Sequence, residues 1–383
     1  MIPYGRQHIT QADIQAVSDV LKSDFLTQGP TVPRFEQAIA RWAGAQHGVA
    51  LNSATSALHV ACLALGLGPG DVLWTTPITF VASANCALYC GARVDFVDID
   101  PDTFTMSPRH LEDKLRKAAQ DGCLPKVIVP VHMCGQSCDM AAIGALAKTY
   151  NIRVIEDASH AIGGLYQNQP VGCCAHSDIT VFSFHPVKII TTAEGGMALT
   201  NSADLAKHMA RLRSHGITRD PADMTCPPDG PWYYQQIELG MNYRMTDMQA
   251  ALGLSQLERL EEYVARRNVL AERYDRLLAH LPIDLPGRLE GVRSAFHLYV
   301  IRLRNSAHHR AVFEGLRAAG IGVNLHYIPV HLQPYYTRMG FAAGDFPAAE
   351  HYYQRAISLP LFAIMTEAEQ DQVIQALQEL VQG

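Results

Sequence analysis

Ser183-Phe184-His185-Pro186-Val187-Lys188 is the stretch that decides how this chain is interpreted, because it joins an apolar run to a single lysine. Residues 179–184 are typical of a short buried strand, and the proline that follows indicates a turn. Paired glycines come shortly afterwards, in Thr191-Thr192-Ala193-Glu194-Gly195-Gly196. A strand that ends in a turn of this kind can present an amine to a buried electrophile.

An acidic pair closes another apolar run. Glu156 and Asp157 follow residues 152–155, and Ser159 and His160 come directly after them. A carboxylate and a lysine on neighbouring strand ends are what a pyridoxal-phosphate site needs. Lys188 would hold the aldehyde as a Schiff base, and Asp157 would keep the pyridine nitrogen protonated so that the ring accepts electrons. Taken singly, Asp157 could be a helix cap and Lys188 a surface lysine.

Composition predicts a globular protein. The chain has 383 residues, of which 48% are hydrophobic and 18% charged, so it can bury a large core in two domains or in one domain with an appendage. The formal net charge of −6 excludes the basic footprint of a nucleic-acid-binding protein. Residues 1–6 lack the layout of a signal peptide, and no apolar run reaches the roughly 20 residues of a membrane helix. We therefore expect a soluble, cytoplasmic protein without a membrane partner.

The nine cysteines are scattered and odd in number, so a disulfide scaffold is not expected. Cys134 and Cys138, with His132 nearby, come closest to a metal pattern, followed by the adjacent Cys173 and Cys174. A closed zinc site would need a second ligand pair at the right spacing. We predict no metal site.

The first half of the chain alternates between strand and helix patterns. Residues 10–45 indicate helices interrupted by Gln28-Gly29-Pro30, and residues 54–67 indicate a helix that ends at Gly68-Pro69-Gly70. Strands are predicted at 72–75, 94–97, 127–131, 152–156 and 179–184, and helices at 80–89, 108–119 and 140–150. This βαβ alternation predicts a largely parallel sheet covered on both faces, hence the α/β fold class.

The alternation fades after about residue 200. Helices are predicted at 204–214, 245–280, 307–319 and 367–382, strands at 297–303 and 322–327, and a loop at 220–232. We place a boundary within the long helix, which gives a large domain at 1–254 and a smaller α+β domain at 255–383.

Two further motifs have the character of a cofactor site. Asn52-Ser53-Ala54-Thr55-Ser56-Ala57 follows an apolar run and opens a helix, whose free N–H groups and dipole favour a phosphate. The same pattern is also that of a simple Ser/Thr N-cap. Phe80 follows a predicted strand, where it could stack on a planar ring or belong to the core. The order and spacing of these motifs, together with Ser183 and Lys188, favour the cofactor.

With these motifs in place, the chain resembles the DegT/DnrJ/EryC1/StrS sugar aminotransferases, which have the aspartate-aminotransferase fold (type I). The motifs that carry the resemblance span nearly the whole chain: residues 26–29, 52–58, 156–163, 183–196, 240–244 and 327–329. Several segments are more similar to one branch, the transaminase of pseudaminic acid biosynthesis: residues 52–58, 75–82, 190–196 and 213–216.

The resemblance implies a set of cofactor contacts. Lys188 would form the Schiff base and Asp157 would pair with the ring nitrogen. Ala54, Thr55 and Ser183 would contact the phosphate, Phe80 would cover the ring, and His160 would lie against the cofactor. Asn242 would reach the phosphate of a second subunit, which makes the protein a homodimer with a shared active site; without the resemblance, Asn242 is a turn residue before a helix.

The resemblance also implies substrate contacts. Tyr4 and the segment Phe25, Leu26 and Thr27 would touch the nucleotide sugar from the amino-terminal side, and His326, Tyr327 and Pro329 from the small domain. Arg213 and Arg244 are nearby candidates for the group that holds the glutamate carboxylate.

The reaction that the resemblance implies is a transamination from L-glutamate to C4 of a UDP-linked 4-keto-dideoxy N-acetyl sugar. A dehydratase branch of the family has a histidine at the lysine position, so the presence of Lys188 argues against it. Two alternatives stay open: transamination of another nucleotide-linked 4-keto sugar, of the perosamine or aminoarabinose type, and a pyridoxal-phosphate-binding regulator that does not turn over.

Overall fold

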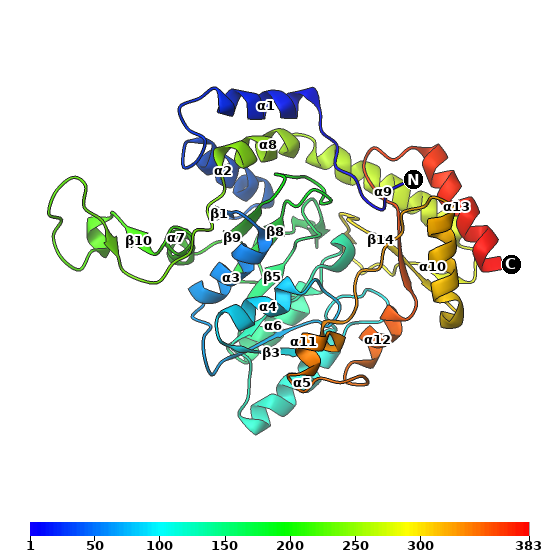
Figure 1. The fold of residues 1–383 in the computed structure, drawn as a ribbon. Helices are drawn as coiled ribbons and strands as arrows, with labels where there is room; N and C mark the ends of the chain where they lie inside the picture. Colours follow the sequence, from blue (N-terminus) through cyan, green and yellow to red (C-terminus); the bar gives the residue numbers. More distant parts are fainter. Residues whose placement is uncertain (383) are drawn as a thin grey trace.

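The computed structural model describes residues 1–382, and its centre is a seven-stranded sheet (Figure 1). The strands β5, β8, β4, β2 and β3 are parallel, whereas β9 runs antiparallel to both of its neighbours, β8 and β1. In spatial order the strands are β1 (His47–Leu51), β9 (Gly196–Thr200), β8 (Ile179–Ser183), β5 (Arg153–Asp157), β4 (Val127–Ile128), β2 (Val72–Thr75) and β3 (Arg93–Phe96).

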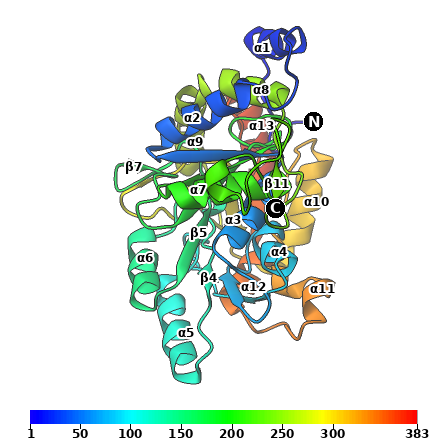
Figure 2. The same ribbon diagram turned by 90° about the vertical axis from the view of Figure 1, so that its left-hand side faces the viewer.

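Helices cover both faces of this sheet, because alternate side chains of a strand point to opposite sides. Val181 packs in a core cluster with α3, α4 and α7, whereas Phe182, the next residue, packs with α2 and α8. Trp74 and Val154 face α5 and α6 in a further cluster. Figure 2 shows this layered arrangement. The covering helices are α2 (Thr31–Ala43), α3 (Ala54–Ala64), α4 (Ala82–Tyr89), α5 (Pro108–Asp121), α6 (Met140–Thr149), α7 (Ala203–Leu212) and α8 (Asp247–Leu257).

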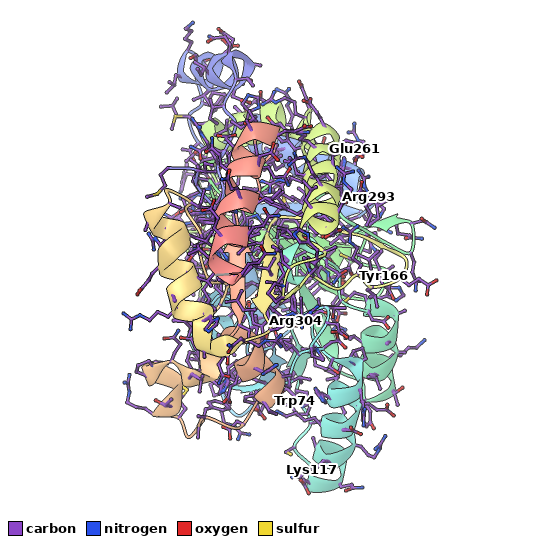
Figure 3. All side chains as sticks on the ribbon, turned by 90° about the vertical axis from the view of Figure 1, so that its right-hand side faces the viewer. Trp74, Lys117, Tyr166, Glu261, Arg293 and Arg304 are labelled. Carbon is purple, nitrogen blue, oxygen red and sulfur yellow. The ribbon has the colours of Figure 1, made fainter. Side chains whose placement is uncertain are left out.

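The carboxyl-terminal part of the chain builds a second core around a three-stranded antiparallel sheet. This sheet consists of β12 (Ile283–Asp284), β14 (Tyr299–Leu303) and β15 (Ala356–Leu359). Figure 3 shows α13 (Glu367–Gln382) between α9 (Leu260–Leu278) and α10 (His309–Ala318) on this side of the molecule. Labelled in the same view, Arg293 of β13 pairs with Glu261 of α9 at 2.6 Å.

The smaller elements connect these cores. A β-ribbon pairs β6 with β7 and β13, and a separate ribbon of β10 and β11 lies in the segment that projects beside α7 in Figure 1. These elements are α1 (Gln11–Leu21), β6 (Leu165–Tyr166), β7 (Gln169–Pro170), β10 (Ile217–Thr218), β11 (Gln235–Gln236), β13 (Val292–Arg293), α11 (Pro334–Thr337) and α12 (Pro347–Tyr353).

The structure corrects three predicted elements. The long helix expected at 245–280 is two helices, because Arg259 has a non-helical backbone between α8 and α9. The strand expected at 127–131 pairs regularly only over Val127–Ile128, since Pro130 has no N–H to donate to a ladder. The strand expected at 322–327 is irregular, and its one isolated bridge joins Asn324 to Ser358. The division at residue 255 remains a prediction, close to the break between α8 and α9.

Candidate active site

A cavity of about 760 Å³ lies where the sheet meets the carboxyl-terminal part of the chain. Its walls come from the amino-terminal Tyr4, from the start of α3, from the ends of β5 and β8, and from residues 324–327. In open α/β sheets, ligands bind in the crevice outside the carboxyl ends of the parallel strands, and this cavity occupies that position.

Lys188 lies in the turn that follows β8, where its backbone N–H donates to the carbonyl of His185 at 2.9 Å. Its side chain lines the cavity. Burial lowers the pKa of Lys188 from 10.5 to about 8, although the negative charge of Asp157 opposes this shift. A substantial share of the amine is therefore neutral near physiological pH, as a nucleophile requires.

Asp157, the last residue of β5, also lines the cavity. One carboxylate oxygen accepts a hydrogen bond from the Ser83 hydroxyl at 2.6 Å. The other accepts from the backbone and the hydroxyl of Ser159, at 3.1 and 2.6 Å. The neighbouring Glu156 points to the other side of the sheet, where it bonds to His132 at 2.7 Å. Of these two adjacent acidic residues, Asp157 therefore lines the cavity together with Lys188, and Glu156 does not.

The start of α3 forms the wall of the cavity next to Ser183. Ser53 caps the helix by accepting from the Ser56 N–H at 3.1 Å, and the N–H groups of Ala54 and Thr55 lie in the first turn, where a helix offers no internal partner. Gly196 makes this approach possible, because a Cβ there would come within 2.5 Å of the Ser53 backbone. The oxygen Oδ1 of Asn52, also in the cavity wall, is buried without a partner.

Imidazole rings also line the cavity, among them those of His160, His297 and His326. The Nε2 of His160 lies 3.2 Å from the Tyr327 hydroxyl, and its ring packs on that of His297 with centroids 4.4 Å apart. Burial, with the charge of Lys188 next, lowers the pKa values of His160 and His297, and it lowers that of His326 to about 4. These rings are therefore neutral at physiological pH. His326 also packs against Tyr4, with ring centroids 5.2 Å apart.

Phe80 stands at the mouth of the cavity with 58% of its surface exposed. Its ring centroid lies 6.2 Å from that of Tyr327. A large aromatic ring left this open is available to cover a planar ligand.

The structure brings together ten of the residues singled out from the sequence. The cavity lining includes Tyr4, Ala54, Thr55, Phe80, Asp157, His160, Ser183, Lys188, His326 and Tyr327.

Five others do not line the cavity of this single chain: Phe25, Leu26, Thr27, Asn242 and Pro329. Phe25 and Leu26 are about half exposed, and the Leu26 carbonyl accepts from the N–H of Asp247, at the start of α8. Asn242 is also exposed and bridges to Ser214. Their predicted roles remain predictions.

The arginine candidates also lie outside the cavity lining. Arg213 bonds to the Glu36 carboxylate and to the carbonyl of Ala50 at 2.6 Å, so its charge is committed to an ion pair between α2 and the end of α7. Arg244 forms a bridge to Leu51 at the end of β1.

Sequence reasoning missed four residues of the site: Thr79, Ser83, His297 and Asn324. Thr79 lies in the loop before α4 and Ser83 is the second residue of that helix, so two hydroxyls four residues apart at a predicted helix start could have been noticed. His297 and Asn324 come from segments that reach the cavity only through the tertiary fold, and no local pattern marks them.

Among residues 1–382, no helix is long and apolar enough to cross a membrane. Within the same residues, no group of three or more His, Cys, Asp or Glu side chains is arranged to hold a metal ion.

Comparison with known proteins agrees with the geometry. The model of the DegT/DnrJ/EryC1/StrS aminotransferase family matches residues 7–378. The spore coat polysaccharide biosynthesis protein SpsC of Bacillus subtilis (strain 168) is 39% identical over 388 aligned positions, which cover all of this chain and 97% of SpsC.

Solved structures agree as well. PseC of Helicobacter pylori, an aminotransferase involved in the biosynthesis of pseudoaminic acid, superposes with a TM-score of 0.92 at 31% identity, over 100% of this chain and 99% of PseC. Spr1654 of Streptococcus pneumoniae, described as a sugar aminotransferase and solved in a PMP form, gives a TM-score of 0.91 at 32% identity, over 100% of this chain and 99% of Spr1654. The family resemblance and the α/β aminotransferase fold predicted from the sequence are thereby confirmed. The chain belongs to the DegT/DnrJ/EryC1/StrS aminotransferase family.

Proposed function

We propose that this protein is a pyridoxal-phosphate-dependent aminotransferase that moves an amino group from L-glutamate to C4 of a UDP-linked 4-keto-dideoxy N-acetyl sugar, in pseudaminic acid biosynthesis. The observation that carries the proposal is the cavity in which the Lys188 amine, the Asp157 carboxylate and the start of α3 meet. The similarity to PseC supports the choice of sugar.

The residues of the cavity fit pyridoxal phosphate. The first turn of α3 offers N–H groups without internal partners, and such a helix start binds phosphate. The carboxylate of Asp157 keeps acceptor capacity beyond its three protein donors, which suits a protonated ring nitrogen. Spr1654 has been solved in PLP and PMP forms, at about the same similarity to this chain.

When bound, pyridoxal phosphate supplies an electron sink for the pair left on a carbon that loses its proton. The chain supplies the rest. The neutral amine of Lys188 takes the Cα proton from glutamate and, in the second half of the reaction, delivers a proton to C4 of the sugar. Asp157 would hold the positive charge of the ring nitrogen, and Phe80 would cover the ring. One base thus serves both half-reactions.

We infer that the site is completed by a second subunit. Among residues 1–382 the cavity lining contains no arginine, and Lys188 is its one lysine, yet its ligands carry phosphate and carboxylate groups. The exposed Asn242 is the residue that the family resemblance directs toward the partner's phosphate. A homodimer with shared active sites follows from this proposal, with Phe25, Leu26, Thr27 and Pro329 as further sugar contacts.

Spectroscopy separates the aminotransferase from a regulator that does not turn over. The purified holoenzyme should lose the absorbance of lysine-bound cofactor when glutamate is added, and the cofactor should remain on the protein in its amine form. Lys188→Ala should show neither the starting absorbance nor turnover, while Lys207→Ala, a change to an exposed lysine of α7, should behave as wild type. A spectrum that does not respond to glutamate would contradict the aminotransferase proposal.

A further inference from the structure

The Asp157 carboxylate is anchored through a hydroxyl that sequence reasoning did not identify. Ser83, the second residue of α4, donates to Asp157 Oδ2 at 2.6 Å, and its own oxygen lies 2.7 Å from Thr79 Oγ1. Both hydroxyl-bearing residues are buried, Ser83 completely and Thr79 to all but 2% of its surface. Thr79 also lines the cavity. The three side chains form a continuous chain from the cavity wall to the carboxylate.

The number of available protons determines which group is the donor in each of these hydrogen bonds. A serine hydroxyl has one proton, and that of Ser83 is committed to Asp157, because the carboxylate oxygen can only accept when it is ionised. The bond between the two hydroxyls must therefore be donated by Thr79 to the Ser83 oxygen. Each bond in such a series polarises the next, so the Thr79 hydroxyl strengthens the bond from Ser83 to Asp157.

The same turn also sets the place of Phe80. The backbone N–H of Ser83 donates to the carbonyl of Phe80 at 3.2 Å, so the residue that anchors Asp157 also closes the turn that presents the exposed ring. The short segment of residues 79–83 thus connects Asp157, which is expected at the ring nitrogen, to Phe80, which is expected over the face of the ring.

We propose that Thr79 and Ser83 are positioning residues, whose hydroxyls hold the Asp157 carboxylate in the orientation that leaves an acceptor site for the pyridine nitrogen of the cofactor. This proposal rests on the proposed function, because it assigns the cavity to pyridoxal phosphate. Ser159 holds the other carboxylate oxygen. Without Ser83, the carboxylate keeps donors on one oxygen only and can rotate away from the ring.

Two substitutions at Thr79 separate this role from packing. Thr79→Val keeps the shape of the side chain and removes the hydroxyl, whereas Thr79→Ser keeps the hydroxyl and removes the methyl group. Ser83→Ala removes the donor to Asp157 itself. Thr200→Val is the matched control, because Thr200 is also completely buried and its hydroxyl bonds at 2.7 Å to the carbonyl of Asp178, outside the cavity lining.

The measurements are the dissociation constant of pyridoxal phosphate from apoprotein, the pH midpoint of the absorbance of bound cofactor, and the melting temperature of the apoprotein. Loss of a hydrogen bond to a charged group should weaken cofactor binding about tenfold in Ser83→Ala. The loss in Thr79→Val should be smaller, about threefold, because it acts through Ser83. The pH midpoint should move upward in both variants. A weaker contact with Asp157 leaves the ring nitrogen less protonated, so less positive charge on the ring opposes protonation of the Lys188 nitrogen.

Thr79→Ser should keep the affinity and the midpoint, and Thr200→Val should lower the melting temperature without moving the midpoint. The proposal is overturned if Thr79→Val binds cofactor with the wild-type midpoint and affinity, or if Thr79→Ser is the more damaged of the two. These outcomes are measured by cofactor binding and are therefore independent of the aminotransferase test. A wild-type protein that binds the cofactor but does not react with glutamate would contradict the proposed function and leave the roles of Thr79 and Ser83 unaffected.

Discussion

At the scale of single residues, the chemistry of the cavity depends on two opposing influences on the Lys188 amine. Burial disfavours the ammonium form and brings the pKa to about 8, while the nearby Asp157 carboxylate stabilises the charge and limits the shift. The neighbouring imidazoles of His160 and His297 are themselves kept neutral by burial and by the lysine charge. Of Lys188, His160 and His297, it is therefore the lysine whose protonation changes near physiological pH.

A pH dependence follows from this pKa. Only the neutral amine attacks an aldehyde, and its fraction rises with pH and is half at about pH 8. The rate at which apoprotein attaches pyridoxal phosphate should therefore rise with pH and level off above a midpoint near 8. Stopped-flow absorbance with excess cofactor measures this rate. A midpoint near 10.5, the ordinary value for lysine, would show that burial does not act on this amine.

At the scale of elements, the site depends on how closely β9 approaches the start of α3. The strand is antiparallel to β8 and β1 and completely buried, and Gly196 at its first position passes next to the backbone of Ser53 and Ala54. The absence of a side chain there lets the start of α3 lie against the sheet. This explains Gly196, the second of the paired glycines after Lys188, in physical terms.

Gly196→Ala should therefore damage both stability and cofactor binding. Its Cβ would come within 2.5 Å of Ser53, and overpacking of this kind costs roughly 1–3 kcal/mol. We expect a lower unfolding midpoint in urea and a pyridoxal-phosphate affinity reduced at least about tenfold, because α3 is displaced. Gly68→Ala is the control: its Cβ would meet no atom within 4 Å, so stability should change by less than about 0.5 kcal/mol. Equal behaviour of the two variants would refute this account of Gly196.

At the scale of the whole molecule, the cavity exists because distant parts of the chain are tied together. The Gly322 N–H donates to the Ile2 carbonyl, and the Leu361 N–H donates to the Tyr4 carbonyl, which places Tyr4 beside His326. Further along, the buried Asp13 bonds to Arg259 at 2.7 and 2.8 Å, where α8 gives way to α9. The amino-terminal segment thus connects the break between α8 and α9 to the cavity.

Much of this arrangement could be predicted from the sequence, because its signals are local. The parallel strands appear as short apolar runs; Asp157 ends one of them, and Lys188 lies in the turn that follows another. The antiparallel β9 was not predicted, since a buried run of five residues carries no sign of its direction. His297, Asn324 and the bond from Ser83 to Asp157 depend on contacts between segments far apart in sequence, which no local period encodes.

Transfer of heavy nitrogen from labelled L-glutamate to a 4-keto sugar tests the central claim most directly. Mass spectrometry of the sugar product should show the label at C4 with the UDP-linked 4-keto-dideoxy N-acetyl sugar, at a kcat/KM well above those for dTDP- and GDP-linked analogues, and no label with Lys188→Ala. Labelling of a dTDP- or GDP-linked sugar in preference to the UDP-linked one would contradict the proposed substrate. Label in the sugar made by Lys188→Ala, at the wild-type rate, would contradict the assignment of Lys188 and with it the account of the site.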